Sequence, residues 1–371
     1  MKVCIIGGHL SPAIAVIDAL GNDHSIVFIG RKYSFEADKT ESLEYHTIQE
    51  RKIPFIELKT GRVQRKLSSQ TIPSLLKVPK GFFQALKVLQ KEAPDVVVGF
   101  GGYLSLPVCL AAYMLHIPII IHEQTLEAGL ANKVIGKLAD AICISFETSK
   151  QFFPQQKCIL TGNPLRPEII AVKQTKKEKH EIPSIFITGG STGSHAINTL
   201  IAEILPSLLE KCTVTHQTGA ANQREDRKML THLVDGLDSE LRKRYRLQEF
   251  MSAKEMADQL YQADVVISRS GMNTTTELLY LEKPCLLIPL PYGQKMEQLQ
   301  NAKYLKDQGL AEIVDQQSIM KDEFLEKIIM MLTQQRAHTH TQKDLHLIHE
   351  KAANHIVRVI NDVYQKKKNT A

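Results

Sequence analysis

What this chain lacks argues against several classes of protein. Aromatic residues make up only 6% of its 371 residues and no known nucleic-acid-binding module is present, so we expect no nucleic-acid partner. The six cysteines are scattered without a Cys-x-x-Cys pair. This usage is typical of reduced, buried thiols in a cytosolic protein rather than of a disulfide or zinc framework. The apolar run within residues 1–8 is too short for a signal peptide and is interrupted by glycines. We expect it to form a first strand.

Familiar metal-binding and nucleotide-binding signatures are missing as well. No Walker motif, metalloprotease motif or Asp-x-Asp motif occurs in the sequence. Four histidines gather near the end of the chain, but no acidic or cysteine ligand accompanies them at a recognised spacing (His338, His340, His346 and His349). We therefore expect neither a metal site nor a bound cofactor.

Acidic residues are absent between Gly61 and Lys91, where seven basic residues alternate with apolar ones. Basic side chains around exposed apolar ones suit an anionic membrane surface. An ordinary solvated helix is the alternative, because Phe83, Leu86 and Leu89 have the spacing of a buried face. The sequence leaves both interpretations open. The apolar run from Tyr103 to Ile121 contains two prolines and is expected to be a buried helix and strand rather than a membrane span.

Two stretches of the chain have the same construction, an apolar run that ends in glycines before an amphipathic helix. They are residues 3–12 and 184–194, and each has a matching second half, at 95–121 and 264–288. A parallel strand followed by a glycine turn and a helix presents unpaired N–H groups that attract anions. We therefore predict an α/β protein with two Rossmann-like domains, whose parallel sheets face each other across a cleft that holds the ligand.

The order of apolar runs and helical patterns also suggests where the domains end. Strand-like and helical patterns alternate in two blocks, which is typical of βαβ units, and a charged stretch separates the blocks. We expect an amino-terminal domain over residues 1–165, a linker over 166–183, a second domain over 184–345, and a helix and tail over 346–371 that could pack back on the first domain.

The segment from Ser268 to Glu277 carries the strongest chemical signal. Asn273 or Thr274 is expected to cap a helix with Glu277 in its first turn. A carboxylate at the carboxyl edge of a parallel sheet can accept both hydroxyls of a ribose. A capping box, in which Glu277 only satisfies the backbone of Thr274, is the structural alternative, and the sequence does not decide between them.

Other polar residues are placed where they could touch a substrate. Ser191, in the glycine turn of the second domain, can donate a hydroxyl to a phosphate, and Gln298 could read sugar hydroxyls, although a polar surface loop is the ordinary alternative. A histidine at the carboxyl end of a strand, such as His9 or His122, can act as a general base near neutral pH or serve as a structural donor. Arg166 would place a guanidinium near a phosphate at the domain junction.

At these residues the sequence resembles the MurG family of inverting GT-B glycosyltransferases. That family moves N-acetylglucosamine from UDP-N-acetylglucosamine to undecaprenyl-diphospho-N-acetylmuramoyl-pentapeptide, converting lipid I to lipid II in peptidoglycan synthesis. The resemblance covers nearly the whole chain and rests on motifs in one order: Gly101–Ser105, His122–Gln124, Ala128–Gly129, Asn132–Lys133, Gly162–Arg166, Gly189–Gly193, His216–Gly219, Glu249–Phe250, Arg269–Glu277, Gln298 and Asn301–Ala302.

The resemblance implies a role for each matching position. Residues implied in UDP-N-acetylglucosamine binding are Thr125, Arg166, Ser191, Met251, Met272, Asn273, Thr274, Thr275, Thr276, Glu277 and Gln298, with Glu277 on the ribose. The implied acceptor side consists of Gly7, Gly8, Gly102, Tyr103, His122 and Glu123, with His9 as the catalytic base. The basic-apolar stretch would lie against an anionic membrane, which implies a peripheral enzyme on the cytoplasmic face of the cell membrane, and no metal or cofactor is implied.

The sequence departs from the family pattern in two places. The first loop, usually Gly-Gly-Thr-Gly-Gly-His, is only Gly7-Gly8-His9 here, which removes backbone donors near the acceptor diphosphate or the donor sugar. The usual His-Glu-Gln-Asn ends in Thr125, which replaces an amide by a hydroxyl. Three alternatives therefore stay open: transfer to another lipid such as diacylglycerol, a non-catalytic scaffold that binds UDP-sugar or membrane, and a UDP-sugar epimerase of the same fold.

Overall fold

The structure is a computed structural model of the chain. It describes residues 1–33, 41–60, 71–178, 181–190, 192–219, 223–291, 296–334 and 349–370. The chain divides into two compact units. The first unit comprises Met1–Arg166 and Ile348–Ala371, and the second unit comprises Pro167–Leu347.

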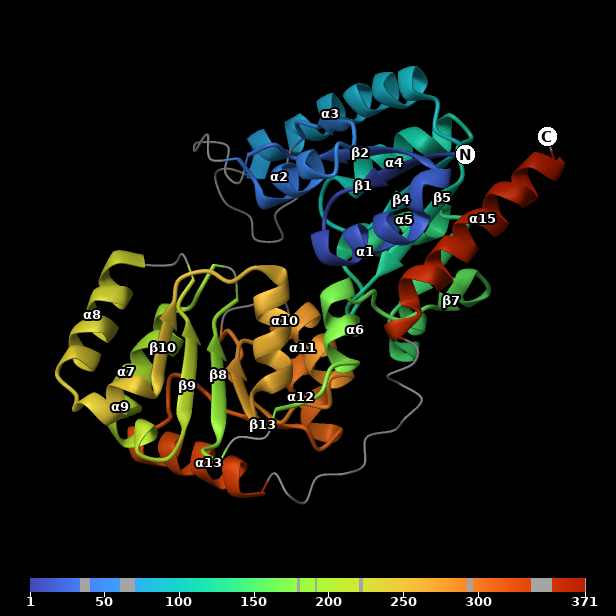
Figure 1. Ribbon diagram of the computed structural model, residues 1–371. Helices are drawn as coiled ribbons and strands as arrows, with labels where there is room; N and C mark the ends of the chain where they lie inside the picture. Colours follow the sequence, from blue (N-terminus) through green and yellow to red (C-terminus); the bar gives the residue numbers. More distant parts are fainter. Residues whose placement is uncertain are drawn as a thin grey trace. The chain divides into compact units, whose positions relative to one another are not determined.

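The first unit contains a seven-stranded parallel sheet (Figure 1). Its strand order is β3-β2-β1-β4-β5-β6-β7. The strands are β1 (Lys2–Ile6), β2 (Ser25–Gly30), β3 (Phe55–Glu57), β4 (Val96–Gly99), β5 (Ile119–Glu123), β6 (Ala141–Ile144) and β7 (Cys158–Leu160). The α-helices are α1 (Leu10–Leu20), α2 (Leu43–Glu50), α3 (Thr71–Glu92), α4 (Ser105–Met114), α5 (Leu130–Leu138) and α15 (Ala352–Thr370).

Apolar side chains cover both faces of this sheet. Because successive residues of a strand point to opposite faces, Cys4 and Ile6 of β1 pack with helices α3, α4 and α5, while Val3 and Ile5 pack with α1 and α15. Helix α15 thus lies beside α1, although more than 300 residues separate them in the chain (Figure 1). The end of the chain closes one face of the first sheet.

The structure tests the interpretations of the two segments, residues 103–121 and 61–91, that the sequence left to be decided. The run from Tyr103 to Ile121 forms α4 and β5, as predicted, and among the described residues no helix is long and apolar enough to cross a membrane. In the basic-apolar stretch, residues 61–70 lie outside the described residues. Leu89 is buried in the core, but Phe83 is 61% exposed, so of the two interpretations left open, the one in which Phe83 shares the buried face of this helix is wrong for this residue.

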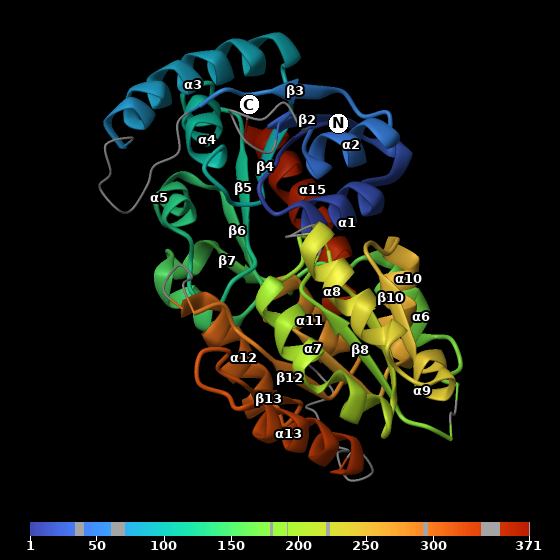
Figure 2. The ribbon, with the colours of Figure 1, turned by 90° about the vertical axis from the view of Figure 1, so that its left-hand side faces the viewer.

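The second unit contains a six-stranded parallel sheet with the order β10-β9-β8-β11-β12-β13. Figure 2 shows β8, β10, β12 and β13 of this sheet among the helices of the unit. This is the strand order of dinucleotide-binding Rossmann folds. The strands are β8 (Ser184–Thr188), β9 (Thr213–Gln217), β10 (Tyr245–Gln248), β11 (Val265–Ser268), β12 (Cys285–Leu287) and β13 (Ala311–Ile313). The helices are α6 (Pro167–Lys173), α7 (His195–Leu209), α8 (Gln223–Asp235), α9 (Ser239–Lys243), α10 (Ala253–Gln262), α11 (Met272–Tyr280), α12 (Glu297–Asp307) and α13 (Lys321–Gln334).

The core of the second unit lies between its sheet and helices α7, α8 and α13. Ile185 and Ile187 of β8 pack there with Leu205 of α7 and Phe324 of α13, and all four side chains are fully buried or nearly so. The stretch expected as a linker begins with α6, which packs against α10 within the second unit. Such a core fixes the carboxyl ends of the strands, where the candidate site lies.

Candidate active site

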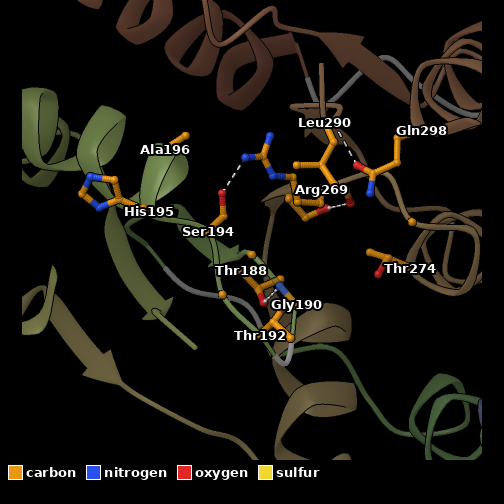
Figure 3. A pocket seen from close by; sticks show the side chains of 14 residues that line it. Thr188, Gly190, Thr192, Ser194, His195, Ala196, Arg269, Thr274, Leu290 and Gln298 are labelled. Carbon is orange, nitrogen blue, oxygen red and sulfur yellow. Dashed lines mark hydrogen bonds between the residues drawn. The ribbon is translucent and has the colours of Figure 1, made fainter. Parts of the chain in front are cut away.

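A cavity of about 440 Å³ opens at the carboxyl ends of β8 and β11 (Figure 3). In this strand order the connections leave in opposite directions from these two strands, and ligands of open α/β sheets bind at such a switch point. The cavity is lined by Thr188, Gly189, Gly190, Thr192, Gly193, Ser194, His195, Ala196, Ser268, Arg269, Gly271, Thr274, Leu290 and Gln298. The second unit forms this cavity from its own residues.

The glycine turn after β8 is closed by its own hydrogen bonds: Gly190 N donates to Thr188 Oγ1 and Gly193 N donates to the Gly190 oxygen, both at 3.0 Å. Gly190 and Gly193 adopt left-handed φ angles of 84° and 76°, which favour glycine. A Cβ at Gly193 would lie 2.1 Å from the Thr218 oxygen, so the backbones of the two neighbouring loops touch at that point. A Cβ at Gly190 would meet nothing within 4 Å, which leaves this part of the turn open. Ser191, the predicted hydroxyl donor, lies outside the described residues.

A chain of buried polar groups fixes the start of α7. The Asn198 side chain donates to the Asp226 carboxylate (2.7 Å) and accepts from His216 Nε2 (3.0 Å), and Tyr245 donates to His216 Nδ1 (2.9 Å). Burial lowers the pKa of His216 to about 3, opposed by the Asp226 charge, so the imidazole is neutral. Asp226 Oδ1 also lies 2.5 Å from Nδ1 of His195, the first residue of α7. This network holds the helix terminus, and its amides, in one place.

The helix after β11 begins at a residue that the sequence did not indicate. Its N-cap is Gly271 and α11 starts at Met272, so the prediction that Asn273 or Thr274 caps the helix was wrong. Glu277 therefore lies beyond the first turn, too far along the helix for a capping box with Thr274. Its side chain is buried at 5% exposure. The structural alternative for Glu277 is removed, while the ribose role stays a prediction.

Of the other predicted donor-site residues of this unit, some line the cavity and others are buried away from solvent. Thr274 and Gln298 line the cavity, and Gln298 Oε1 accepts from Leu290 N at 3.1 Å. Met272 is buried, as are Thr275 and Thr276, and the Thr276 hydroxyl donates to the Met272 oxygen at 2.9 Å. Asn273 and Thr275 each have a buried side-chain oxygen without a partner among the described residues. Met251 lies in the loop between β10 and α10, half-buried.

Arg269, which the sequence analysis quoted only as part of a motif, reaches across this site. Its guanidinium donates to the Ser194 hydroxyl (2.6 Å), at the N-cap of α7 (Figure 3). It also donates to the Ile288 oxygen (2.9 Å), after β12. Burial lowers the pKa of Arg269. The sequence did contain a feature that could have indicated this residue, because an arginine directly follows an apolar strand there.

In the first unit, the shortened turn after β1 places His9 beside the second glycine turn. His9 is the N-cap of α1, and its backbone N–H donates to the Phe100 oxygen at 3.1 Å. A Cβ at Gly101 would lie 3.1 Å from His9 Cδ2, so the imidazole lies against that glycine. Gly8 also touches this turn, and Gly102 follows with a left-handed φ of 75°. Desolvation lowers the pKa of His9, opposed by the charge of Glu123.

Glu123 and His122, predicted on the acceptor side, have partners inside the first unit. The Glu123 carboxylate is 3% exposed and accepts from Thr125 N, Thr125 Oγ1, Gly129 N and Asn132 Nδ2 at 2.6 to 3.0 Å. His122 Nε2 donates to the Gly162 oxygen at 3.1 Å, and burial lowers its pKa to about 4. Both side chains shape the loop after β5, and the Thr125 hydroxyl belongs to the same network. Tyr103 and Arg166 are half-buried.

Glu44 is a further residue that the sequence analysis missed. Its carboxylate accepts a hydrogen bond from the backbone N–H of Arg31 at 3.1 Å and lies against the first glycine turn. A Cβ at Gly7 or Gly30 would collide with this carboxylate, which explains why both positions are glycine. Burial raises the pKa of Glu44. No sequence pattern connects helix α2 to this turn.

Comparison with known proteins identifies the family. The glycosyltransferase family 28 N-terminal domain matches residues 6–144, and the glycosyltransferase family 28 C-terminal domain matches residues 184–359. The UDP-N-acetylglucosamine--N-acetylmuramyl-(pentapeptide) pyrophosphoryl-undecaprenol N-acetylglucosamine transferase of Treponema denticola is 33% identical over 330 residues, or 86% of this chain and 84% of the relative. The chain belongs to this transferase family. A transferase of the same name from Geotalea daltonii is 35% identical over 334 residues, covering 88% and 86% of the two chains.

Solved structures agree with this membership. MurG of Acinetobacter baumannii, a protein of this transferase family, matches with a TM-score of 0.72 and 25% identity over 97% of this chain and 99% of that chain. The predicted GT-B fold with two Rossmann-like domains and the predicted glycosyltransferase class are confirmed. A UDP-GlcNAc 2-epimerase from Neisseria meningitidis, bound to UDP-GlcNAc, matches with a TM-score of 0.65 at 15% identity over 98% and 100% of the two chains. That likeness concerns the fold alone.

Proposed function

We propose that this chain transfers N-acetylglucosamine from UDP-N-acetylglucosamine to the 4-hydroxyl of undecaprenyl-diphospho-N-acetylmuramoyl-pentapeptide, converting lipid I to lipid II in peptidoglycan synthesis. The observation that carries the proposal is membership of the transferase family over more than four fifths of the chain. The cavity at the switch point of the second sheet supports it, because a glycine turn and a helix N-terminus meet there.

The second unit takes the donor in this proposal. The start of α7 faces a diphosphate, Thr274 and Gln298 contact the nucleotide sugar, and Glu277 accepts the ribose hydroxyls. Thr274 and Gln298 line the cavity, and the buried position of Glu277 suits a carboxylate that is shielded from water when the ribose is bound. Ser191, Met251, Met272, Asn273, Thr275 and Thr276, with Thr125 and Arg166 of the first unit, complete the proposed donor set.

The first unit takes the acceptor, and His9 acts as the general base. A base must be unprotonated before the reaction, and desolvation keeps the His9 pKa below its ordinary value, so the imidazole is neutral at neutral pH. His9 also lies at the carboxyl ends of β1 and β4, next to the turn that contains Gly102 and Tyr103. Gly7, Gly8, His122 and Glu123 then shape the acceptor side.

The enzyme works at the cytoplasmic face of the cell membrane as a peripheral protein in this proposal. Helices α3, α4 and α5 pack side by side, and their exposed apolar side chains include Phe83, Tyr113, Met114, Leu130 and Val134. Lys80 and Lys87 flank Phe83 on α3 and are exposed. Exposed apolar side chains with lysines beside them bind anionic lipid through both the hydrophobic effect and charge.

The decisive experiment incubates the purified protein with labelled UDP-N-acetylglucosamine and a short-chain lipid I analogue. We expect labelled lipid II, and loss of transfer in the His9→Ala and Glu277→Ala variants. Transfer to diacylglycerol but not to the lipid I analogue would support the other lipid acceptor. Binding of UDP-N-acetylglucosamine without transfer to either lipid would support a scaffold and refute the proposal.

Vesicle sedimentation tests the membrane surface independently. The wild type should sediment with vesicles that contain anionic phosphatidylglycerol and remain in solution with neutral phosphatidylcholine. Phe83→Glu should weaken sedimentation, since it removes an exposed apolar side chain and adds a repelling charge. Glu326→Gln on α13 of the second unit is the control, because it changes a charge on a helix outside this surface. Equal sedimentation of all three proteins would refute the surface.

A further inference from the structure

The carboxylate of Glu44 is fixed by the loop that follows β2. Helix α2 begins at Leu43, so Glu44 lies in its first turn. The N-cap residue Ser42 donates its hydroxyl to the Arg31 oxygen, and its backbone N–H donates to the Lys32 oxygen, both at 2.7 Å. Glu44 Oε2 accepts from Arg31 N at 3.1 Å. These bonds tie the start of α2 to the carboxyl end of β2 and hold the carboxylate against the first glycine turn.

This carboxylate occupies space that two glycines leave empty. A Cβ at Gly7 would lie 2.0 Å from Glu44 Oε1, and a Cβ at Gly30 would lie 2.7 Å from Glu44 Oε2. The Phe28 ring lies 3.0 and 2.9 Å from the same two points. Neither glycine has a left-handed φ, so the contact rather than the backbone conformation requires glycine there. The residue after β1 and the last residue of β2 therefore meet the same side chain.

The turn that lies against this carboxylate carries the proposed base. Only Gly7 and Gly8 separate β1 from His9, so a shift of the turn reaches the imidazole directly. A Cβ at Gly8 would lie 2.3 Å from the Gly101 oxygen. The backbone N–H of His9 donates to the Phe100 oxygen at 3.1 Å. Different elements thus hold consecutive residues of the turn, α2 at Gly7 and the loop after β4 at Gly8 and His9.

We propose that Glu44 is a positioning residue of the transfer reaction, because it fixes the turn that places the His9 imidazole against Gly101. This inference rests on the proposed function, in which His9 is the base. A general base must lie within hydrogen-bond distance of the hydroxyl whose proton it takes, and a misplacement of about 1 Å costs about 100-fold in rate. Glu44 does not touch the substrate in this role, since it acts through His9.

A residue that only stabilises the fold would have a different effect. Its loss would lower the melting temperature and leave the kcat of the folded enzyme unchanged. Loss of a positioning residue lowers kcat and also changes the surroundings of the imidazole. Desolvation lowers the pKa of His9, and the charge of Glu123 on β5 opposes this. His122, also on β5, adds no charge at neutral pH, because burial lowers its own pKa to about 4. Both neighbours stay when Glu44 is replaced, so a turn that moves into water should raise the His9 pKa toward about 6.5.

Kinetics of Glu44→Ala with UDP-N-acetylglucosamine and the lipid I analogue provide the first test. We expect kcat to fall about 100-fold. Calorimetry should show an unchanged UDP affinity, because Glu44 belongs to the first unit and the second unit forms the donor cavity. Glu44→Gln keeps the size of the side chain and an oxygen that accepts from Arg31 N, so it should recover most of the lost rate. This variant also provides the test if Glu44→Ala does not fold.

Glu50→Ala is the matched control. Glu50 is the last residue of the same helix α2, and its side chain is exposed. The chemical change is identical to that in Glu44→Ala, but it occurs at the end of the helix that is away from the glycine turn. This variant should keep the kcat and the UDP affinity of the wild type.

Nuclear magnetic resonance of the histidine ring protons tests the positioning without any substrate. The His9 signal is the one that disappears in His9→Ala. We expect a His9 pKa below about 6.5 in the wild type and in Glu50→Ala, and a rise toward this value in Glu44→Ala. The acidic limb of kcat/KM should move to higher pH by the same amount, because activity falls when the base takes up a proton.

Gly7→Ala tests the contact from the other side. The added Cβ would displace the carboxylate, since the end of a glutamate side chain is free to rotate away. Gly7→Ala should therefore reproduce the loss of kcat seen in Glu44→Ala. The double variant should be about as active as either single variant, because both changes remove the same contact.

Two outcomes would overturn the inference. One is a Glu44→Ala enzyme that melts at a lower temperature but keeps the kcat and the His9 pKa of the wild type. The other is a double variant in which the two losses of rate multiply, which would show that Gly7 and Glu44 act independently. Failure of the proposed function is a separate result, since a wild-type protein that transfers no sugar would still show by resonance whether the His9 pKa depends on Glu44.

Discussion

Replacing Gly271 by alanine probes the wall of the cavity with little effect on the fold. Gly271 has φ −63° and ψ 147°, a conformation that alanine adopts without strain. A Cβ at this position would meet no atom within 4 Å. The remaining cost comes from the N-cap of α11, where alanine is about 1 kcal/mol worse than the preferred residues and glycine only a few tenths worse. We expect the free energy of unfolding to fall by no more than about 1 kcal/mol, and the melting temperature by about 2–4 °C.

The effect on the donor should be larger. Gly271 lines the cavity, so the added methyl group occupies space that the nucleotide would fill. An ordinary carbon contact is about 3.5–4.0 Å, and a ligand packed against the Gly271 Cα would therefore have to move by more than an ångström. We expect at least a tenfold weaker affinity for UDP, equivalent to about 1.4 kcal/mol.

Calorimetry of UDP binding and thermal denaturation of the same samples give both quantities. Gly236→Ala is the control, because Gly236 lies in the loop after α8 and a Cβ there would come no nearer than 3.5 Å to its neighbours. If Gly271→Ala melts as expected but binds UDP within twofold of the wild type, the ligand does not contact this wall and the proposed donor position is wrong.

Four further predictions follow from other parts of the structure. In the pH profile of kcat/KM, the acidic limb should lie below the ordinary histidine pKa of about 6.5, because activity falls only when pH drops through the lowered pKa of His9; a limb above 6.5 would exclude His9 as the base. Glu123→Ala should destabilise the protein by about 3 kcal/mol in denaturant titration, since it leaves the donors around a buried carboxylate unpaired, and a loss below about 0.5 kcal/mol would contradict this role. Gly193→Ala should abolish soluble expression or lower the melting temperature far more than Gly271→Ala does, because its Cβ would lie 2.1 Å from a backbone oxygen at a left-handed φ; equal melting temperatures would refute the packing argument. Burial lowers the pKa of Lys283 to about 7, so the unfolded chain binds more protons between about pH 7 and 10; stability should rise with pH over this range, and Lys283→Met should remove that rise.

The sequence was sufficient to predict the fold because the central strands of both sheets are nearly pure apolar runs. Val96–Gly99 and Val265–Ser268 are buried along their whole length, as parallel strands between two layers of helices must be. Glycines at Gly190 and Gly193 likewise marked the turn where the cavity lies. These are local signals, and the parallel fold follows from them.

The remaining features of the site depend on residues that are distant in the sequence. The His216 network joins four separate elements, and the carboxylate of Glu44 reaches the first turn from helix α2. Helix α11 begins at Met272 because Gly271 adopts an extended conformation at its N-cap, which side-chain capping preferences do not predict. Phe83 is exposed although its spacing suits a buried face, since spacing alone does not say which face of a helix meets the core.

The carboxylate of Glu44 makes the two sheets chemically unequal. In the first unit, a carboxylate tethered to the same polypeptide already lies against the glycine turn, at an effective concentration that a dissolved phosphate does not reach. The turn after β8 has no described side-chain carboxylate in this role, and its Gly190 faces open space. Two halves of similar architecture therefore differ as phosphate sites, because in one of them a carboxylate of the chain lies against the turn that a phosphate would meet.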